Sequence, residues 1–555
     1  MIKNILNKIA HKIPFLKNLT YTHWFWIIVS FITLLRIFII GKFGLDGDES
    51  YYWIWSRNLS LSYYDHPPMV AYIIYVSTFI FGNSEFAVRF PTIITWFFIF
   101  IMTFYLTKKL FGEKSAFWSI VSSFLVPLFM INNLDIRPEI PFTFFWMLFI
   151  FIFWKIIETS NSKYWYLIGI ILGFGLLSKY TAILLIPSVL LFLIISHKHR
   201  FWFFKKEPYI ALIIAFIVFS PVIFWNIENN FASFGYQFNR VITKSHYEGL
   251  NILIRLFIAP LKQFQIIGFI IFIYWAVLFW SIYEYFRENR DSLLLIFTFS
   301  FPILLFFDII GLHNWILPYW LTSGYLVLSL GVGELTQLGW RNKWLRIYSY
   351  LSWGLGFITV FLLLINIFYK VIPDKTFYSK FETFKQLKDI YKIKISDHSD
   401  NYYGRKEIAN KVYDFTKHKE KGIIIFSNDY GEASRLSFYL PGNPEVYCLN
   451  DVIDTYDFWQ RNLASLNGKD SIFVTNAMNF TEPTKVYPFE SWEKPEMVEI
   501  YREGRKIEIF YLYYGKNFQL EKLDPKYTSA ILGPKLTLKE GLIRLWNRII
   551  NIIKK

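Results

Sequence analysis

About eleven long apolar segments occupy residues 1–370 of this 555-residue chain, and they limit its fold more than any other feature. The hydrocarbon core of a bilayer is about 30 Å thick, and about 20 helical residues that rise 1.5 Å each are needed to cross it. The segments have this length, so we expect a polytopic α-helical membrane protein with about eleven transmembrane helices. They begin near Trp24, Pro91, Ser115, Pro141, Tyr164, Ala182, Tyr209, Phe264, Leu293, Trp315 and Trp344.

The composition excludes a soluble enzyme, a disordered chain and a fibrous repeat. Hydrophobic residues make up 54% of the chain, and charged residues only 18%, against about 25% in a typical soluble protein. Cys448 is the only cysteine, which excludes an intrachain disulfide framework and a cysteine-based zinc site. In a membrane protein the net charge of +16 indicates basic loops that face the cytoplasm and anionic lipids. We therefore expect membrane lipids as partners and no nucleic acid.

Lysine and arginine gather in every second loop, whereas the loops between hold the acids of residues 46–65 and 135–139. By the positive-inside rule, this alternation predicts a cytoplasmic N-terminus in a plasma (inner) membrane. An odd number of spans then places everything after about Pro373 on the extracytoplasmic side. The basic residues are Lys3, Lys8, Lys12 and Lys17, then Lys108/Lys109, Lys155/Lys163, those of 197–206, Arg287/Arg290 and Arg341/Lys343/Arg346.

The composition becomes polar and mixed after residue 370, which predicts an extracytoplasmic α/β domain over residues 371–530. Within it, residues 421–427 and 471–475 have the pattern of strands, and 431–440 that of a helix. Residues 531–555 predict a basic amphipathic helix. Such a helix lies in the membrane interface or packs on the preceding domain.

Residues 47–57 (GDESYYWIWSR) and 63–68 (YYDHPP) place several ionisable groups directly after a membrane span. Charges near a membrane are costly, so they usually face a partner or a watery cavity. Asp46 alone is typical of a solvated acid. The aromatic residues and paired prolines of the whole segment instead predict a rigid wall around a site.

Residues 48–53 (DESYYW) and 64–68 (YDHPP) resemble the first external loop of the GT-C glycosyltransferases of family 39/83. The family includes dolichyl-phosphate-mannose–protein mannosyltransferases and the aminoarabinose transferases that modify lipid A. The resemblance runs from about residue 20 to 460 and includes the outer domain of the bacterial branch. The other matching segments, in family order, are 137–146, 177–181, 220–226 with 232–234, 314–318, and 438–442 with 446–447.

This resemblance implies a GT-C catalytic domain over residues 1–370. It would act as a hexosyl- or pentosyltransferase that moves a sugar from a polyprenyl phosphate to a lipid, glycan or protein acceptor, with inversion at the anomeric carbon. Asp48 matches the catalytic Asp, and such a displacement needs a carboxylate that accepts the proton of the attacking group. Glu49 would orient a base or ligand, or act as a buried hydrogen-bonding group. Cations would hold the leaving phosphate.

Asp65 and His66 match positions where aminoarabinose transferases carry an acid followed by a lysine, so both are candidates for substrate binding. Histidine titrates near pH 6.5, and this departure argues against an aminoarabinose donor; the alternative for His66 is a role at the entry to the next helix. Lys179 matches the family's lysine that binds the lipid phosphate. Further phosphate candidates, with snorkelling to lipid headgroups as the alternative, are Arg57, Arg89, Arg137 and Arg240.

The second external loop offers two acids, Asp135 and Glu139, and the resemblance does not choose between them. Glu139 matches the family's Asp if Pro138 is aligned, and Asp135 matches it if the preceding asparagines are aligned. Either would hold the acceptor or, with Asp48, a divalent cation. Oxygen ligands of this kind favour Mg²⁺ or Mn²⁺. An ordinary loop acid is the alternative for each.

Other functions predict different patterns. A secondary transporter or a flippase of lipid-linked sugars tends to have repeated halves and sites at the bilayer midplane, and this sequence has neither. A membrane receptor or scaffold that uses the outer domain would tolerate Asp48→Asn and Lys179→Ala. An O-antigen ligase or polymerase usually relies on a large outer loop late in the chain.

Overall fold

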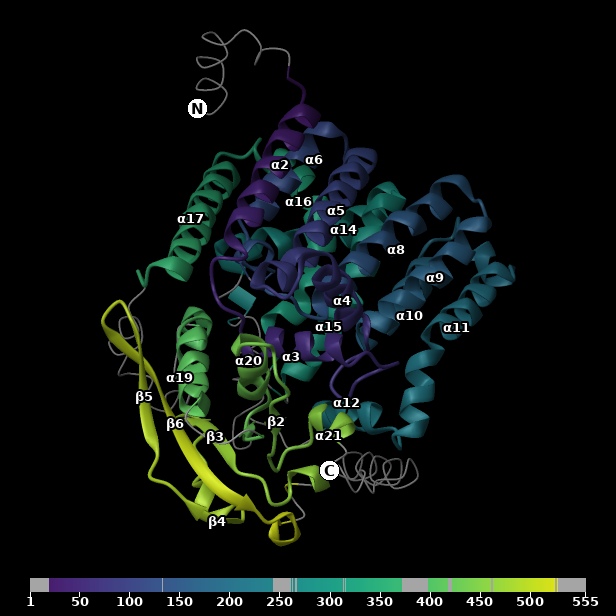
Figure 1. The fold of residues 1–555 in the computed structure, drawn as a ribbon. Helices are drawn as coiled ribbons and strands as arrows, with labels where there is room; N and C mark the ends of the chain where they lie inside the picture. Colours follow the sequence, from purple (N-terminus) through teal and green to yellow (C-terminus); the bar gives the residue numbers. More distant parts are fainter. Residues whose placement is uncertain are drawn as a thin grey trace.

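The computed structural model describes residues 19–131, 133–242, 261, 263–264, 267–312, 314, 316–371, 398–417, 422–460, 463–524 and 527. A bundle of helices forms one part of the molecule, and a mixed sheet with its own helices lies against one end of that bundle (Figure 1). This arrangement confirms the expected multi-pass helical protein with a C-terminal α/β domain. The basic helix predicted over residues 531–555 lies outside the described residues.

Seven of the described helices are long and apolar enough to cross a membrane. They are α2 (Tyr21–Ile39), α5 (Glu85–Phe111), α8 (Glu139–Thr159), α11 (Glu207–Glu228), Gly268–Glu288, which contains α14 (Ile271–Glu288), α15 (Asp291–Gly311) and α17 (Lys343–Phe368). The apolar core of α5, α8 and α15 is 61% buried, against 17% for α2. These three helices are therefore central, and α2 is peripheral. The total of about eleven spans stays a prediction.

Shorter helices fill the spaces between the long ones. They are α4 (Met69–Phe81), α6 (Glu113–Phe124), α7 (Pro127–Met130), α9 (Lys163–Ser178), η2 (Tyr180–Leu184) with α10 (Leu185–Ile195), α12 (Ala232–Ile242) and α16 (Thr322–Gly339). In a bilayer, apolar helices associate mainly through close van der Waals packing. Small residues at the contacts allow the helices to approach closely enough for it. A Cβ added at Gly169 of α9 would lie 2.5 Å from the carbonyl oxygen of Ala211 in α11.

The loops with the basic clusters contact one another at the end of the bundle away from the sheet (Figure 1). The start of α2, the turns between α5 and α6, α8 and α9, and α14 and α15, and the end of α16 all meet there. The contacts are Glu113 with Thr22, Lys109 with Glu158 at 2.6 Å, Lys198 with Asp291 at 3.3 Å, and Lys114 over the Trp340 ring at 5.9 Å. The basic loops thus share one end, and the acidic loops lie at the other.

The C-terminal domain is a six-stranded sheet in the order β2-β1-β3-β6-β4, with β5 paired to β6. β1, β2 and β3 are parallel, and β6 is antiparallel to β3, β4 and β5. Helices α19 and α20 lie between the sheet and the helical bundle (Figure 1). The bounds are η7 (His398–Tyr402), α19 (Arg405–Lys417), β1 (Ile424–Ser427), α20 (Tyr430–Tyr439), β2 (Tyr447–Cys448), α21 (Tyr456–Trp459), β3 (Ser471–Asn476), β4 (Phe489–Trp492), β5 (Glu496–Arg502) and β6 (Arg505–Phe518).

A short helix, α3 (Gly47–Arg57), joins the two parts of the molecule by packing against α20. Its start is a capping box, in which the Asp46 carboxylate accepts from the N–H of Glu49 and the Glu49 carboxylate accepts from the N–H of Asp46. Backbone meets backbone at this junction. A Cβ added at Gly431 would lie 3.0 Å from the Cα of Gly47. The first turn of α3 is therefore fixed from both sides.

Candidate active site

Asp48 lies on the first turn of α3, where the membrane helices meet the C-terminal domain. The hydroxyl of Tyr430, at the start of α20, donates a 3.0 Å hydrogen bond to its Oδ1. The Nη1 of Arg137, in the segment before α8, lies 3.5 Å from its Oδ2. The side chain keeps 35% of its surface exposed, so a substrate has access to it.

The surroundings make Asp48 a better base than its neighbour Asp46. Burial raises the pKa of Asp48, and the negative charge of Asp46 raises it further, against the opposing effect of Arg137. Burial also acts to raise the pKa of Asp46, but Arg137 and the N–H of Glu49 outweigh it and lower that pKa. A carboxylate with a raised pKa accepts a proton more readily, so of the two acids Asp48 is the better candidate for a proton acceptor.

Arg137 stands among three carboxylates. Its Nη2 lies 2.9 Å from Asp46 and 3.5 Å from Asp135, and Nη1 faces Asp48. The guanidinium also lies 4.8 Å from the centre of the Tyr319 ring. Because one fixed cation faces three acids, Arg137 keeps the acids together in a nearly buried site.

Glu49 and Arg89 form a fully buried ion pair, with 2.5 Å between Arg89 Nη2 and Glu49 Oε2. Arg89 Nε also donates to Glu49, and its remaining N–H groups donate to the backbone carbonyls of Ile40, Phe43 and Gly44. All the donors of Arg89 are thus used inside the protein. The expected phosphate role of Arg89 is therefore corrected, since the residue is needed to balance a buried carboxylate. The contacts of Glu49 match one of its two expected alternatives, that of a buried hydrogen-bonding group.

Asp65 is held by groups from both parts of the molecule. Its Oδ2 accepts hydrogen bonds from the hydroxyl of Tyr51 at 2.8 Å and from that of Thr455 at 2.9 Å. Its backbone carbonyl accepts from the Gln237 amide at 2.5 Å. The neighbouring His66 interacts electrostatically with Glu139. These contacts bring the second half of the predicted first loop to the same junction.

Lys179 and Glu139 form a second nearly buried ion pair, with 2.6 Å between the Nζ and Oε1 atoms. The lysine ends α9, and the glutamate begins α8. The ammonium group also lies 5.3 Å from the centre of the Trp320 ring. The predicted lysine and one of the two predicted second-loop acids are therefore direct partners. The other acid, Asp135, belongs to the Arg137 cluster.

The candidate metal ligands Asp48, Asp135 and Glu139 do not converge on a common point. Within the part of the chain that the structure describes, no group of three His, Cys, Asp or Glu side chains has the geometry of a metal site. Asp48 and Asp135 share the guanidinium of Arg137, and Glu139 holds the ammonium of Lys179. Protein cations already balance these carboxylates, so the arrangement does not fit a shared divalent cation.

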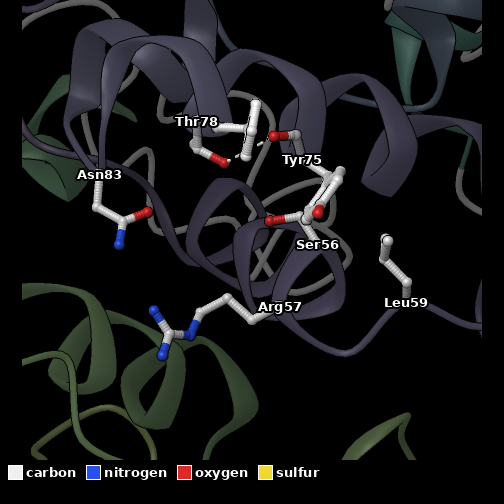
Figure 2. A pocket seen from close by; sticks show the side chains of 7 residues that line it. Ser56, Arg57, Leu59, Tyr75, Thr78 and Asn83 are labelled. Atoms are coloured by element: carbon white, nitrogen blue, oxygen red, sulfur yellow. Dashed lines mark hydrogen bonds between the residues drawn. The ribbon is translucent and has the colours of Figure 1, made fainter.

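Arg57, the last residue of α3, lines a cavity of about 340 Å³ together with side chains of α4 (Figure 2). Its guanidinium lies 5.0 Å from the centre of the Trp53 ring, and the view shows it extended toward the C-terminal domain. Phe79, on the same wall, is 80% exposed. A cation beside exposed apolar side chains suits a lipid headgroup and its chains. Arg240 lies in α12, and its side chain is outside the described part.

Three hydroxyl groups that the C-terminal domain brings to this site are not among the residues predicted from sequence. Tyr402 donates to Asp135 at 2.8 Å, Tyr430 to Asp48, and Thr455 to Asp65. Between 267 and 390 residues separate the members of these pairs. No local spacing pattern marks such partners: the sequence predicted the domain itself, but not which of its hydroxyl groups reach the acids.

The chain is similar in sequence and in fold to known membrane glycosyltransferases. Residues 65–225 match the family described as dolichyl-phosphate-mannose-protein mannosyltransferase. The chain is 22% identical over 323 residues to the lipid A galacturonosyltransferase RgtD of Rhizobium johnstonii, and 24% identical over 270 residues to an uncharacterized protein of Aquifex aeolicus. These matches cover 57% and 48% of this chain, and 66% and 51% of the lengths of the two relatives.

The fold is shared with a solved structure. ArnT from Cupriavidus metallidurans, in a crystal structure bound to undecaprenyl phosphate, superposes with a TM-score of 0.59 at 13% identity. That superposition covers 88% of this chain and 98% of ArnT. The matched family segment contains Asp65, Glu139 and Lys179, and the shared fold includes the C-terminal domain. Part of the chain, residues 65–225, is therefore similar to the dolichyl-phosphate-mannose-protein mannosyltransferase family, and the chain shares the fold of ArnT.

Proposed function

We propose that this protein transfers a sugar from a polyprenyl-phosphate donor to an acceptor hydroxyl at the extracytoplasmic face, with inversion at the anomeric carbon. The observation that carries the proposal is the placement of Asp48. It is a partly exposed carboxylate with a raised pKa, at the junction where the membrane helices meet a polar domain. A general base needs both access to its substrate and a pKa that favours taking up a proton.

In the proposed reaction an acceptor hydroxyl approaches Asp48, which takes its proton. The acceptor oxygen then forms a bond to C1 of the sugar. The bond between C1 and the phosphate oxygen breaks, and its electron pair leaves with the lipid phosphate. Arg137 keeps Asp48 in place, and the negative charge that grows on the phosphate needs a cation. Lys179 is the candidate for that role.

The donor class rests on two observations. The ArnT structure of the same fold is bound to undecaprenyl phosphate. In this chain Lys179 lies at the C-terminal end of α9. The cavity beside Arg57 also has a cation next to apolar side chains, which supports a second contact with the lipid phosphate. We propose that both cations act on lipid headgroups, and that Asp65 and His66 contact the sugar or phosphate.

For the acceptor, we propose a lipid, glycan or protein that reaches the site from the polar side. The name of RgtD supports a lipid A-type glycolipid among these, and the family name supports a protein. The proposed topology has about eleven spans and a cytoplasmic N-terminus. The domain of residues 371–530 then lies outside. The gathering of the basic loops at one end supports this orientation.

Purified protein in lipid vesicles, supplied with a panel of polyprenyl-phosphate sugars and acceptors, tests the proposal. We expect mass spectrometry to find product with one donor class. Asp48→Asn should lower turnover by roughly two orders of magnitude or more, because the amide cannot accept the proton. Asp414→Asn, at an exposed position of α19, is the matched control and should leave turnover unchanged. Near-normal turnover by Asp48→Asn would overturn the assignment of the base.

A further inference from the structure

The C-terminal domain places one hydroxyl group on an acid of each of three segments from the membrane part. Tyr430 donates to Asp48, at the start of α3. Thr455 donates to Asp65, and Tyr402 donates to Asp135. A domain that only rested on the bundle would not need to match three carboxylates with three donors. These contacts indicate that side chains of the C-terminal domain form part of the site.

Tyr430 is the member of this set that touches the proposed base, and several contacts hold it in place. It is the first residue of α20, where the Asp429 carboxylate caps the helix by accepting from the N–H of Glu432 at 2.8 Å. Its ring lies 4.4 Å from the ring of Tyr51, centre to centre. The hydroxyl is thus carried by a capped helix and a packed ring, which fixes the direction in which it donates.

We propose that Tyr430 is a positioning residue for the transfer reaction, and that its hydroxyl holds the Asp48 carboxylate in the orientation that receives the acceptor's proton. The inference rests on the proposed function, because it assumes that Asp48 is the base. One lone pair of Oδ1 is used by the tyrosine, and the exposed part of the carboxylate stays available to the acceptor. The outer domain then completes the site directly.

The charges around Asp48 give the sign of the expected pH effect. Asp46 faces it from its own segment, Arg137 from the segment before α8, and Tyr430 and Arg435 from α20. The phenol groups of Tyr52 and Tyr319 also interact with it. The tyrosine hydroxyl stabilises the charged carboxylate and so lowers the pKa of Asp48. Without it that pKa rises, and activity that needs the deprotonated base is lost at a higher pH than in the wild type.

The test compares the pH dependence of kcat and KM for the wild type, Tyr430→Phe and Tyr456→Phe in the same vesicle assay. Tyr456 is the matched control because its ring also packs on Tyr51, but its hydroxyl bonds to Ser434 inside the domain. We expect Tyr430→Phe to move the acidic limb of the kcat profile to higher pH. On that limb kcat falls roughly tenfold or more, as for the loss of one hydrogen bond to a charged group, while KM is unchanged. Tyr456→Phe should keep the wild-type profile.

Asp48→Asn in the same series separates this inference from the function on which it rests. An inactive Asp48→Asn together with a wild-type profile for Tyr430→Phe overturns the role of Tyr430 and leaves the base intact. A shift shared equally by Tyr456→Phe also overturns it, because that shift reports only the packing of the domain. Turnover by Asp48→Asn removes the base and this inference together. If Tyr430→Phe does not fold, Tyr430→His keeps a ring donor and should retain part of the activity at high pH, whereas an inactive folded Tyr430→His contradicts the proposal.

Discussion

The ion pair of Lys179 and Glu139 determines what a lipid phosphate meets when it enters the proposed site. Each side chain is less than a tenth exposed, and only 2.6 Å separates the charged atoms. A buried carboxylate without its cation is costly, so loss of the lysine destabilises the protein as well as any phosphate complex. Neutralising Glu139 together with Lys179 separates the loss of stability from the loss of phosphate binding.

We expect Lys179→Met to lower both the thermal stability of the protein and its affinity for the donor. The double variant Lys179→Met/Glu139→Gln should recover stability, because no buried charge is left alone. Its KM for the donor should stay roughly tenfold or more above the wild type, as expected for a lost charge-assisted hydrogen bond. Thermal unfolding and donor titrations measure the two quantities. A wild-type KM in the double variant would mean that Lys179 serves only to balance Glu139.

At the scale of single residues, local motifs predict positions better than partners. The motifs around Asp48 and Lys179 predicted two residues that lie at the start or end of helices in the structure. Asp48 lies at the start of α3, and Lys179 at the end of α9. Arg89 was expected to bind phosphate, yet it balances Glu49, 40 residues away in sequence. An arginine beside a membrane end has the same local pattern in both roles. What decides between them is the nearest buried carboxylate, which depends on tertiary packing.

Among the elements, α3 is a helix whose start is marked in the sequence, although residues 47–57 resemble an external loop. Residues 47–57 were treated as part of an outer loop, but they form a helix. Asp46 followed three positions later by Glu49 is the spacing of a capping box, and a run of aromatic residues follows. The strands at β1 and β3 and the helix α20 were predicted correctly, because short buried runs and a capped polar helix have distinct patterns.

The contact between α3 and α20 leaves no room for a side chain at Gly431. We expect Gly431→Ala to push the two helices apart, since its Cβ would lie 3.0 Å from Gly47 Cα and 3.1 Å from Asp429 Oδ1. A shift of a few tenths of an ångström at the base should lower kcat roughly tenfold. Activity per folded protein measures this effect. Gly354→Ala in α17, where a Cβ would meet nothing within 4 Å, should behave as the wild type, and equal activity of the two variants would contradict the argument.

For the whole molecule, the gathering of basic loops at one end and acids at the other predicts opposite labelling of the two ends. Cys448 is the only cysteine and is buried, so a Cys448→Ser background suits single-cysteine labelling. We expect a membrane-impermeant maleimide to reach Lys506→Cys, in the C-terminal domain, in intact cells. Arg341→Cys, in the turn after α16, should react only after the cells are permeabilised. The reverse pattern would overturn the proposed orientation.

The long separation between Asp48 and Tyr430 has a consequence for how the protein is made. A ribosome that has produced the first 140 residues has already placed Asp48 and Arg137 in the chain, but the helix that carries Tyr430 begins 290 residues later. Throughout that interval Asp48 lacks its hydrogen bond from Tyr430. The contact between Tyr430 and Asp48 therefore forms only after α20 has been translated, so the geometry around Asp48 is completed late in synthesis.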